Sequence, residues 1–213
     1  MKSIKINFSF FSSLFLQKLP ITTFEENCLQ KLNPQKALEY RYSRGKLRNF
    51  LSPILEIPSL EIPISAPPGR PPKLKEGFGY VSISHSKNAL LIGWSEHPLG
   101  VDIEHSDRKI KADEIIKRFY TENEQIELKN FSGEDLRKKC LDLWVIKESS
   151  IKSIYGTIFQ DLDNWEFSKI NNTSFNKKIG LKRKIFLKEI DKYKIGIAYD
   201  LKVDESNFFI SRN

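Results

Sequence analysis

The stretch at residues 99–105 constrains the fold most strongly, because apolar and acidic residues alternate along it. Side chains alternate between the two faces of a β-strand, so Asp102 and Glu104 share one face while Val101 and Ile103 share the other. The apolar face belongs to a core. The acidic face is stable in water or beside a cation, and hard divalent cations take such oxygen ligands. From this stretch alone, a solvated strand face and a metal site both remain open.

The overall composition is that of a folded protein with an excess of positive charge. The 213 residues are 39% hydrophobic and 29% charged, which fits a folded protein rather than a disordered one, and their net charge is +8. The length suits one domain or two small halves packed together. The charge favours an anionic partner, and nucleic acid, a phosphorylated small molecule and an acidic protein all qualify.

Cysteine usage and hydropathy point to the cytoplasm. Cys28 and Cys140 do not form a Cys-x-x-Cys pair, so reduced thiols are expected. Polar residues interrupt the apolar run Phe8–Leu16 and no small-x-small cleavage site follows, so we do not expect a secretion signal. No run approaches the ~18 apolar residues that a membrane span needs, and no membrane partner is expected.

The first half reads as a strand, two helices and further strands. The patterns predict a strand over Ile4–Phe10, a short helix after the capping box at Thr22, and a helix from Pro34 to about Leu51 that Pro53 stops. Seven of the ten prolines lie in residues 53–72, which predicts an extended connector with one or two short edge strands. Strand-like runs at 80–84, 89–95 and 99–105 predict an antiparallel meander.

The second half repeats the same order of elements. The patterns predict helices over 112–119, after Thr121, and from Ser132 to about Ile154 with Gly156 as its stop. Strands are predicted over 165–170, 177–188 and 192–200. Because strand, helices and strands occur twice, the sequence favours an α+β fold of two similar halves, residues 1–98 and 99–213.

The predicted helix after Ser132 carries a third carboxylate. Trp144, Glu148 and Lys152 stand at i, i+4 and i+8 and share a face. A surface pair between Glu148 and Lys152, worth only ~0.3–0.5 kcal/mol, is the simplest interpretation. The tryptophan on the same stripe argues against full exposure, and a partly buried carboxylate needs a partner. Glu148 is therefore a candidate third oxygen ligand for Mg²⁺, which favours phosphate oxygens to complete its octahedron.

Candidate phosphate-binding residues lie upstream. Arg41, Arg44 and Arg48 form one basic stripe at i, i+3 and i+7. His85 falls between two predicted strands, and Arg70 lies between Gly69 and Pro71 on the stiff connector. Each of these residues taken singly has an ordinary solvated interpretation. Together with the carboxylates they form a set that could hold a phosphorylated ligand.

Two motifs carry a specific resemblance. Residues 100–104 read Gly-Val-Asp-Ile-Glu and residues 144–152 read Trp-Val-Ile-Lys-Glu-Ser-Ser-Ile-Lys, preceded at 82–86 by Ser-Ile-Ser-His-Ser. In these motifs and their separation the sequence resembles the 4'-phosphopantetheinyl transferases, specifically the larger surfactin-synthetase-activating type. Weaker likeness extends from about Leu32 to about Asp200.

The resemblance implies an enzyme that transfers the 4'-phosphopantetheine arm of coenzyme A to a serine of an apo acyl or peptidyl carrier protein. Adenosine 3',5'-bisphosphate would be released. It also implies two pseudo-symmetric α+β halves with the active site between them, dependence on Mg²⁺ or on Mn²⁺ in its place, and a cytoplasmic monomer. Fatty-acid, polyketide and nonribosomal-peptide pathways all use such carriers.

The resemblance also implies roles for individual residues. The implied metal ligands are Asp102, Glu104 and Glu148. The implied contacts to coenzyme A are Arg41, Arg70, Ser84, His85, Lys147 and Lys152. The implied catalytic residues are Glu148, Lys152 and Glu124, with Lys152 neutralising the pyrophosphate. Glu124 equally fits a capping box with Thr121, so the general base stays open between Glu148 and Glu124.

The sequence departs from the family pattern in two places. The lysine motif often continues with Gly-x-Gly, whereas Gly156-Thr157-Ile158 lacks the second glycine, and Arg70 replaces a lysine with a forked donor. The sequence allows two other functions: a nucleic-acid-binding protein using the lysine-rich stretch 177–194, and a family member that binds a carrier without transfer. The intact acidic and lysine motifs favour an active enzyme without a nucleic-acid partner.

Overall fold

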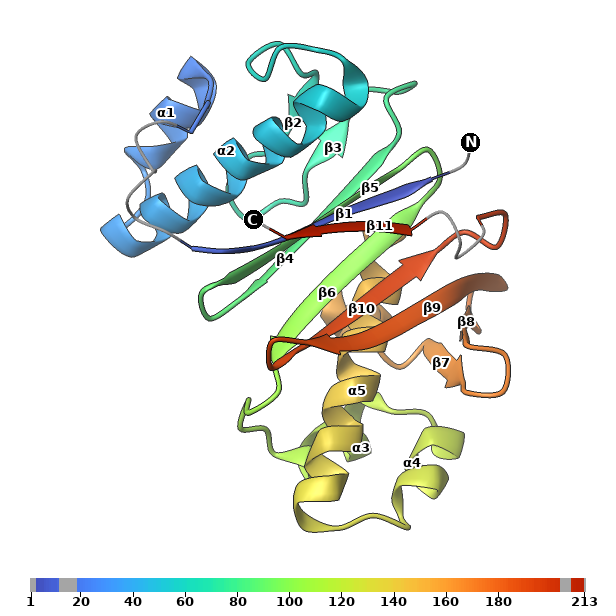
Figure 1. Ribbon diagram of the computed structural model, residues 1–213. Helices are drawn as coiled ribbons and strands as arrows, with labels where there is room; N and C mark the ends of the chain where they lie inside the picture. The colour runs from blue at the N-terminus through green and yellow to red at the C-terminus, as the bar shows by residue number, and fades with distance from the viewer. Residues whose placement is uncertain (1–2, 12–18, 204–207, 213) are drawn as a thin grey trace.

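The computed structural model describes residues 3–11, 19–203 and 208–212, and it has the predicted α+β class (Figure 1). Two larger sheets pack together, and helices cover their outer sides. Of the apolar run Phe8–Leu16, residues 12–16 lie outside the described residues. No helix in the described part of the chain is long and apolar enough to cross a membrane.

The first sheet has four strands in the order β11-β1-β5-β4. These are β1 (Ile4–Phe10), β4 (Tyr80–Ser86), β5 (Ala89–Ser95) and β11 (Phe208–Arg212). The strand predicted over Ile4–Phe10 is confirmed; it runs antiparallel to β5 and parallel to β11. Helix α2 (Pro34–Leu55) packs on one face of this sheet, with α1 (Thr23–Leu29) beside it.

The second sheet has five strands in the order β6-β10-β9-β8-β7. These are β6 (Leu99–His105), β7 (Trp165–Ser168), β8 (Thr173–Asn176), β9 (Leu181–Ile190) and β10 (Tyr193–Tyr199). Helix α5 (Gly133–Lys152) packs closely on it. A Cβ atom at Gly100 would lie 1.9 Å from the Ser149 carbonyl oxygen, so the glycine lets β6 and α5 approach. The remaining helices are α3 (Ala112–Phe119), α4 (Glu122–Leu128) and α6 (Ile158–Asp161).

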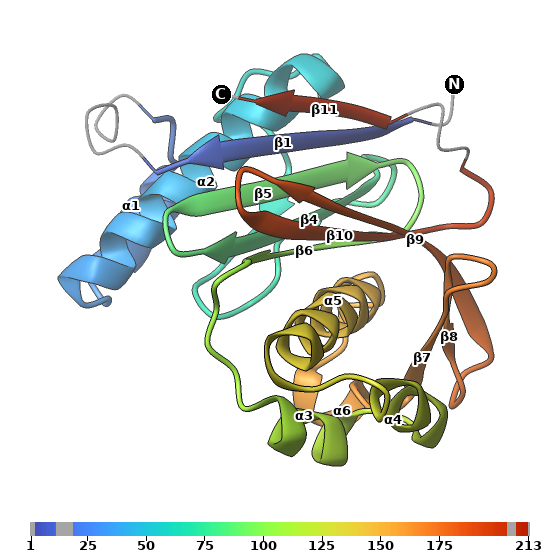
Figure 2. The same cartoon turned by 60° about the horizontal axis from the view of Figure 1, so that its bottom comes forward.

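A shared apolar core lies between the two sheets. Ile4, Ile6 and Phe8 of β1 pack in one cluster with the apolar faces of β6 and β10, including Val101 and Ile103. Helix α5 lies on the other side of the second sheet (Figure 2). The alternation read from residues 99–105 is thereby explained: the apolar face meets the first sheet, and the acidic face meets the helix layer.

The predicted meander is wrong at its third strand. β4 and β5 form an antiparallel hairpin, but β6 pairs with β10 rather than with β5. Both edges of β5 are already occupied, by β1 and by β4. β6 instead lies against β4 through serine hydroxyls: Ser82 Oγ accepts from the Val101 N–H (3.0 Å) and Ser86 Oγ from the His105 N–H (3.2 Å).

The prediction that Pro53 stops helix α2 is wrong. The helix continues past Pro53 to Leu55, because a proline in the last turn removes only one late hydrogen bond, and Glu56 closes the end by donating its N–H to the Ser52 carbonyl. The proline-rich connector contains one short edge strand, β2 (Ile64–Ser65), as predicted, and β2 pairs with β3 (Lys73–Leu74), which follows the connector directly.

The C-terminal strands differ in their bounds from the prediction. The strand predicted over 165–170 is the shorter β7, and the sequence patterns missed β8. The predicted strand over 177–188 begins later, at Leu181, because residues 177–180 form the turn between β8 and β9. The division into halves 1–98 and 99–213, and their pseudo-symmetry, stay predictions; β11 of the second range pairs with β1 of the first.

Two arginines on α2 make ion pairs of very different burial. Arg48 Nε lies 2.8 Å from Glu25 Oε2, with both side chains at most 4% exposed, and Arg48 also donates to the Ser59 carbonyl. Arg41 pairs with Glu26 at a half-exposed position. Arg48 therefore joins α1, α2 and the connector, whereas Arg41 adds a surface contact.

We expect Arg48→Met to lower the free energy of unfolding by about 3–5 kcal/mol, because it leaves the Glu25 carboxylate buried without its counter-charge. Arg41→Met is the matched control on the same helix and should cost at most about 1 kcal/mol. Urea unfolding followed by circular dichroism measures both. Equal losses for the two variants would contradict the structural role of Arg48.

Candidate functional site

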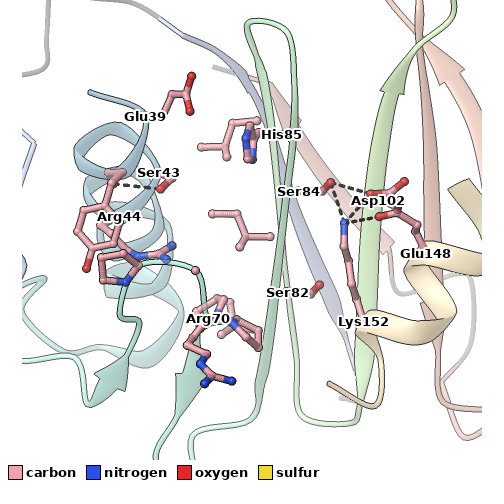
Figure 3. Close-up of a pocket in the computed structure, with 18 of the residues that line it drawn as sticks. Glu39, Ser43, Arg44, Arg70, Ser82, Ser84, His85, Asp102, Glu148 and Lys152 are labelled. Atoms are coloured by element: carbon pink, nitrogen blue, oxygen red, sulfur yellow. Dashed lines mark hydrogen bonds and ion pairs between the residues drawn. The ribbon is translucent and has the colours of Figure 1, made fainter. Parts of the chain in front are cut away.

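A pocket of about 1320 Å³ lies where α2, the connector, β4, β6 and α5 meet. Most of the predicted site residues line it: Arg70, Ser84, His85, Asp102, Glu104, Glu148 and Lys152. Side chains on β4 alternate, so Ser84 points toward Asp102 while His85 points toward α2 (Figure 3). The pocket therefore has an acidic side on β6 and α5, and a second side on α2 and the connector.

On the acidic side, Asp102, Ser84 and Lys152 form one hydrogen-bonded cluster. Ser84 Oγ donates to Asp102 Oδ1 (2.7 Å), and Lys152 Nζ donates to the same oxygen (2.6 Å) and to Ser84 Oγ (3.0 Å). Lys152 Nζ also lies 3.4 Å from Glu148 Oε2. The helix stripe predicted through Glu148 and Lys152 therefore reaches the acidic face of β6, and it is not a plain surface pair.

Glu104 belongs to the same acidic side but has its own partners. Ser86 Oγ donates to Glu104 Oε2 (2.9 Å), and the Arg108 guanidinium pairs with the other carboxylate oxygen. Burial, and then the charge of Asp102, raise the pKa of Glu104 above its usual range.

Burial and the repulsion between neighbouring carboxylates act together on the pKa values of this cluster. Burial, and then the nearby charge of Asp102, raise the pKa of Glu148 to about 7. For Lys152, burial acts to lower the pKa, but the charges of Asp102 and Glu148 outweigh it and raise the pKa above its usual value. The lysine ammonium therefore supplies part of the positive charge that the three acids require.

One acceptor in the cluster has no partner. Asp102 is 2% exposed, and its Oδ2 atom is buried without a hydrogen-bond donor. An unpartnered buried carboxylate oxygen is costly unless a cation or donor reaches it. Within the described residues, no three His, Cys, Asp or Glu side chains are already arranged around a metal position. The donor chemistry fits a hard divalent cation, and the carboxylates would have to reorient to complete the ligand set.

The opposite side of the pocket carries cations. Arg44 lies against the Tyr40 ring (4.8 Å to its centroid) and donates from Nε to the Ala66 carbonyl (2.9 Å). Arg70 and His85 are exposed at the pocket, and Lys36, Lys73 and Lys87 also line it. The phosphate groups of a ligand would meet positive charge on this side of the pocket. On the other side they would meet carboxylates, which suit a metal.

Arg41 does not belong to the cationic side of the pocket. It pairs with Glu26 and is not among the residues that line the pocket, whereas Arg44, three residues later, is. The basic stripe that the spacing predicted thus separates into three environments: a surface pair at Arg41, the pocket at Arg44, and a buried pair at Arg48. Spacing along a helix indicates the shared face but not the neighbours that each side chain meets.

Glu124 and Lys147 also lie outside the pocket. Lys147 is fully buried and donates to Glu124 Oε2 (2.7 Å) and to the Trp165 carbonyl (2.5 Å). Glu124 Oε1 accepts from the Phe167 N–H (3.1 Å), and Glu124 completes the capping box with Thr121. The structure thus places both residues inside the fold, where they join α4, α5 and β7 and do not line the pocket, and their predicted roles at the site stay predictions.

The end of α5 shapes the pocket's rim. The helix runs to Lys152 with Ser153 as its C-cap, close to the predicted end near Ile154, but the left-handed residue is Tyr155 (φ 55°), one residue before the predicted stop Gly156. Tyr155, Gly156 and Thr157 all line the pocket. Sequence reasoning missed Tyr155 because only glycine or asparagine signals a left-handed position.

Comparisons with known proteins agree with the motifs. Residues 98–198 match the model of the 4'-phosphopantetheinyl transferase superfamily. The chain is also 32% identical, over 133 residues, to the 4'-phosphopantetheinyl transferase gsp of Aneurinibacillus migulanus. The resemblance to 4'-phosphopantetheinyl transferases is confirmed.

The two matches cover different shares of the proteins. The alignment to the Aneurinibacillus transferase spans 61% of this chain and 54% of that relative, so the chain spans about half the length of the curated relative it matches. The superfamily match includes β6 and α5, and with them Asp102, Glu104, Glu148 and Lys152. The transferase-like segment therefore carries the acidic side of the pocket, and the cationic side comes from residues before it.

We expect Glu124→Gln to lower the free energy of unfolding by about 3 kcal/mol or more, because the Lys147 ammonium loses its buried counter-charge. Glu122→Gln, at an exposed position of the same helix, is the control and should change little. Thermal and urea unfolding measure the difference. A Glu124→Gln protein as stable as wild type would contradict the structural assignment and return Glu124 to consideration as a base.

Proposed function

We propose that the protein transfers the 4'-phosphopantetheine arm of coenzyme A to a serine of an apo acyl or peptidyl carrier protein. The observation that carries this proposal is the pocket itself, where a buried carboxylate cluster faces a cationic wall. Coenzyme A has both features that such a pocket selects: a pyrophosphate for the acidic, metal-binding side and a further phosphate for the cations. The superfamily match over β6 and α5 supports the same reaction.

In the proposed reaction, the serine hydroxyl oxygen of the carrier attacks the β-phosphorus of coenzyme A. A phosphorus–oxygen bond to the serine forms, the pyrophosphate bond breaks, and adenosine 3',5'-bisphosphate leaves. Glu148 accepts the hydroxyl proton, because it lines the pocket while Glu124 is held inside the fold by Lys147. Lys152 offsets the negative charge that develops on the 5'-phosphate of the leaving adenosine 3',5'-bisphosphate as the pyrophosphate bond breaks.

Asp102, Glu104 and Glu148 would hold Mg²⁺, or Mn²⁺ in its place, and a bound ion would add positive charge beside the pyrophosphate. Arg44, Arg70 and His85 would bind phosphate groups from the other side of the pocket, and Ser84 would contact them from the acidic side. This assignment replaces Arg41 by Arg44, because Arg44 lines the pocket. A cytoplasmic location and a monomeric state stay predictions.

Transfer is tested by incubating the protein with coenzyme A, Mg²⁺ and several apo carriers, followed by intact mass spectrometry. We expect a carrier to gain the mass of the phosphopantetheine arm, and Asp102→Asn to reduce the rate at least ~100-fold because it removes a buried charge from the reacting site. Asp107→Asn, whose side chain is largely exposed, is the control. Salt-dependent DNA binding without transfer to any carrier would instead favour the nucleic-acid alternative.

Metal binding has its own test, independent of activity. Isothermal titration with Mn²⁺ should give one site in the wild-type protein, and Glu148→Gln should weaken it by about tenfold or more through loss of a charged ligand. Glu134→Gln, on the exposed first turn of the same helix, should bind as wild type does. Equal affinities for the three proteins would remove Glu148 from the metal site.

A further inference from the structure

Tyr155 occupies a backbone position that normally selects glycine. The Gly156 N–H donates to the Ile151 carbonyl (3.0 Å) and the Tyr155 N–H to the Lys152 carbonyl (3.1 Å), which are the two bonds of a Schellman motif. Tyr155 is the left-handed residue of that motif, with φ 55°. A large side chain there is unfavourable compared with glycine, and strained residues of this kind gather at ligand sites.

The Tyr155 ring makes one contact that a glycine could not. The Lys73 ammonium lies 4.7 Å from the ring centroid, in the geometry of a cation–π interaction. Lys73 belongs to β3 and Tyr155 to the loop after α5, so the contact joins two separate elements that both line the pocket. In the chain as described, no carboxylate lies within ion-pair distance of Lys73, and its charge is not neutralised.

Lys73 differs in this respect from other cations at the pocket. Lys152 donates to Asp102 and Ser84, and Arg44 donates to the Ala66 carbonyl. An aromatic ring holds an ammonium in place mainly through its charge, so N–H donors of Lys73 remain available to an anion. The pair therefore presents a positioned positive charge to the pocket.

We propose that Tyr155 is a positioning residue that holds the Lys73 ammonium for a phosphate group of the bound coenzyme. The proposal rests on the proposed function for the identity of the ligand. It adds to the site a residue pair that lies outside both motifs of the transferase resemblance. It also accounts for a tyrosine at a left-handed position where glycine would be less strained.

The test is calorimetric binding of coenzyme A to wild type, Tyr155→Gly, Tyr155→Phe, Lys73→Met and the Lys73→Met/Tyr155→Gly double variant. We expect Tyr155→Gly and Lys73→Met each to raise the Kd about fivefold or more, and Tyr155→Phe to bind as wild type because the ring remains. Because Tyr155 acts through Lys73, the double variant should bind no more weakly than Lys73→Met alone.

Two matched variants control for backbone and charge effects. Glu56→Gly removes a left-handed, non-glycine residue at the end of α2, outside the pocket, and should leave the Kd unchanged. Lys75→Met removes a neighbouring lysine that does not line this pocket and should also leave it unchanged. Tyr155→Gly should be at least as stable as wild type, so weaker binding could not come from unfolding.

The outcomes separate this proposal from the proposed function. If wild type binds coenzyme A and Tyr155→Gly binds it equally well, the positioning role is overturned while the transferase assignment stands. The role is likewise overturned if the losses at Lys73 and Tyr155 add in the double variant. If wild type does not bind coenzyme A at all, both proposals fall together.

Discussion

The serine hydroxyls between β4 and β6 are the interaction on which the site depends. Two sheets meet at these strands without a backbone ladder, and the strand N–H groups at Val101 and His105 donate to Ser82 and Ser86 instead. Unpaired N–H groups there would be costly. Ser84 lies between these two serines on β4. Its hydroxyl does not accept from a backbone N–H of β6 but donates to the Asp102 carboxylate. The contact that joins the sheets thus also sets the acidic side of the pocket.

Collecting three carboxylates beside this junction would be unfavourable without positive charge. Lys152 supplies part of it, through contacts of 2.6 Å to Asp102 and 3.4 Å to Glu148. The lysine lies one helical turn after Glu148, so its position follows from the helix that delivers the acid. One Asp102 oxygen is still left without a partner. The cluster is thereby held together by the fold while retaining an acceptor for a further cation.

Local patterns predicted much of this, and long-range neighbours limited the rest. The alternation at 99–105, the capping boxes at Thr22 and Thr121, and the stripe through Glu148 each depend on residues close in sequence, and all are present. The partner strand of β6 depends on which sheet edges are free. Likewise, Glu124 meets Lys147 only because α4 packs on α5, so its capping-box motif was visible while its buried ion pair was not.

The end of α5 shows a different limit, set by conformational preference rather than by distance. Glycine is the usual left-handed residue after a helix, so the sequence pointed to Gly156, one residue beyond the true position. Gly156 is required for another reason: a Cβ atom there would lie 2.7 Å from an Asp161 carboxylate oxygen. Tyr155 takes the strained position and faces the pocket. Its ring lies 4.7 Å from the Lys73 ammonium, a contact that a glycine could not make, and we propose this contact as the reason for the departure from local preference.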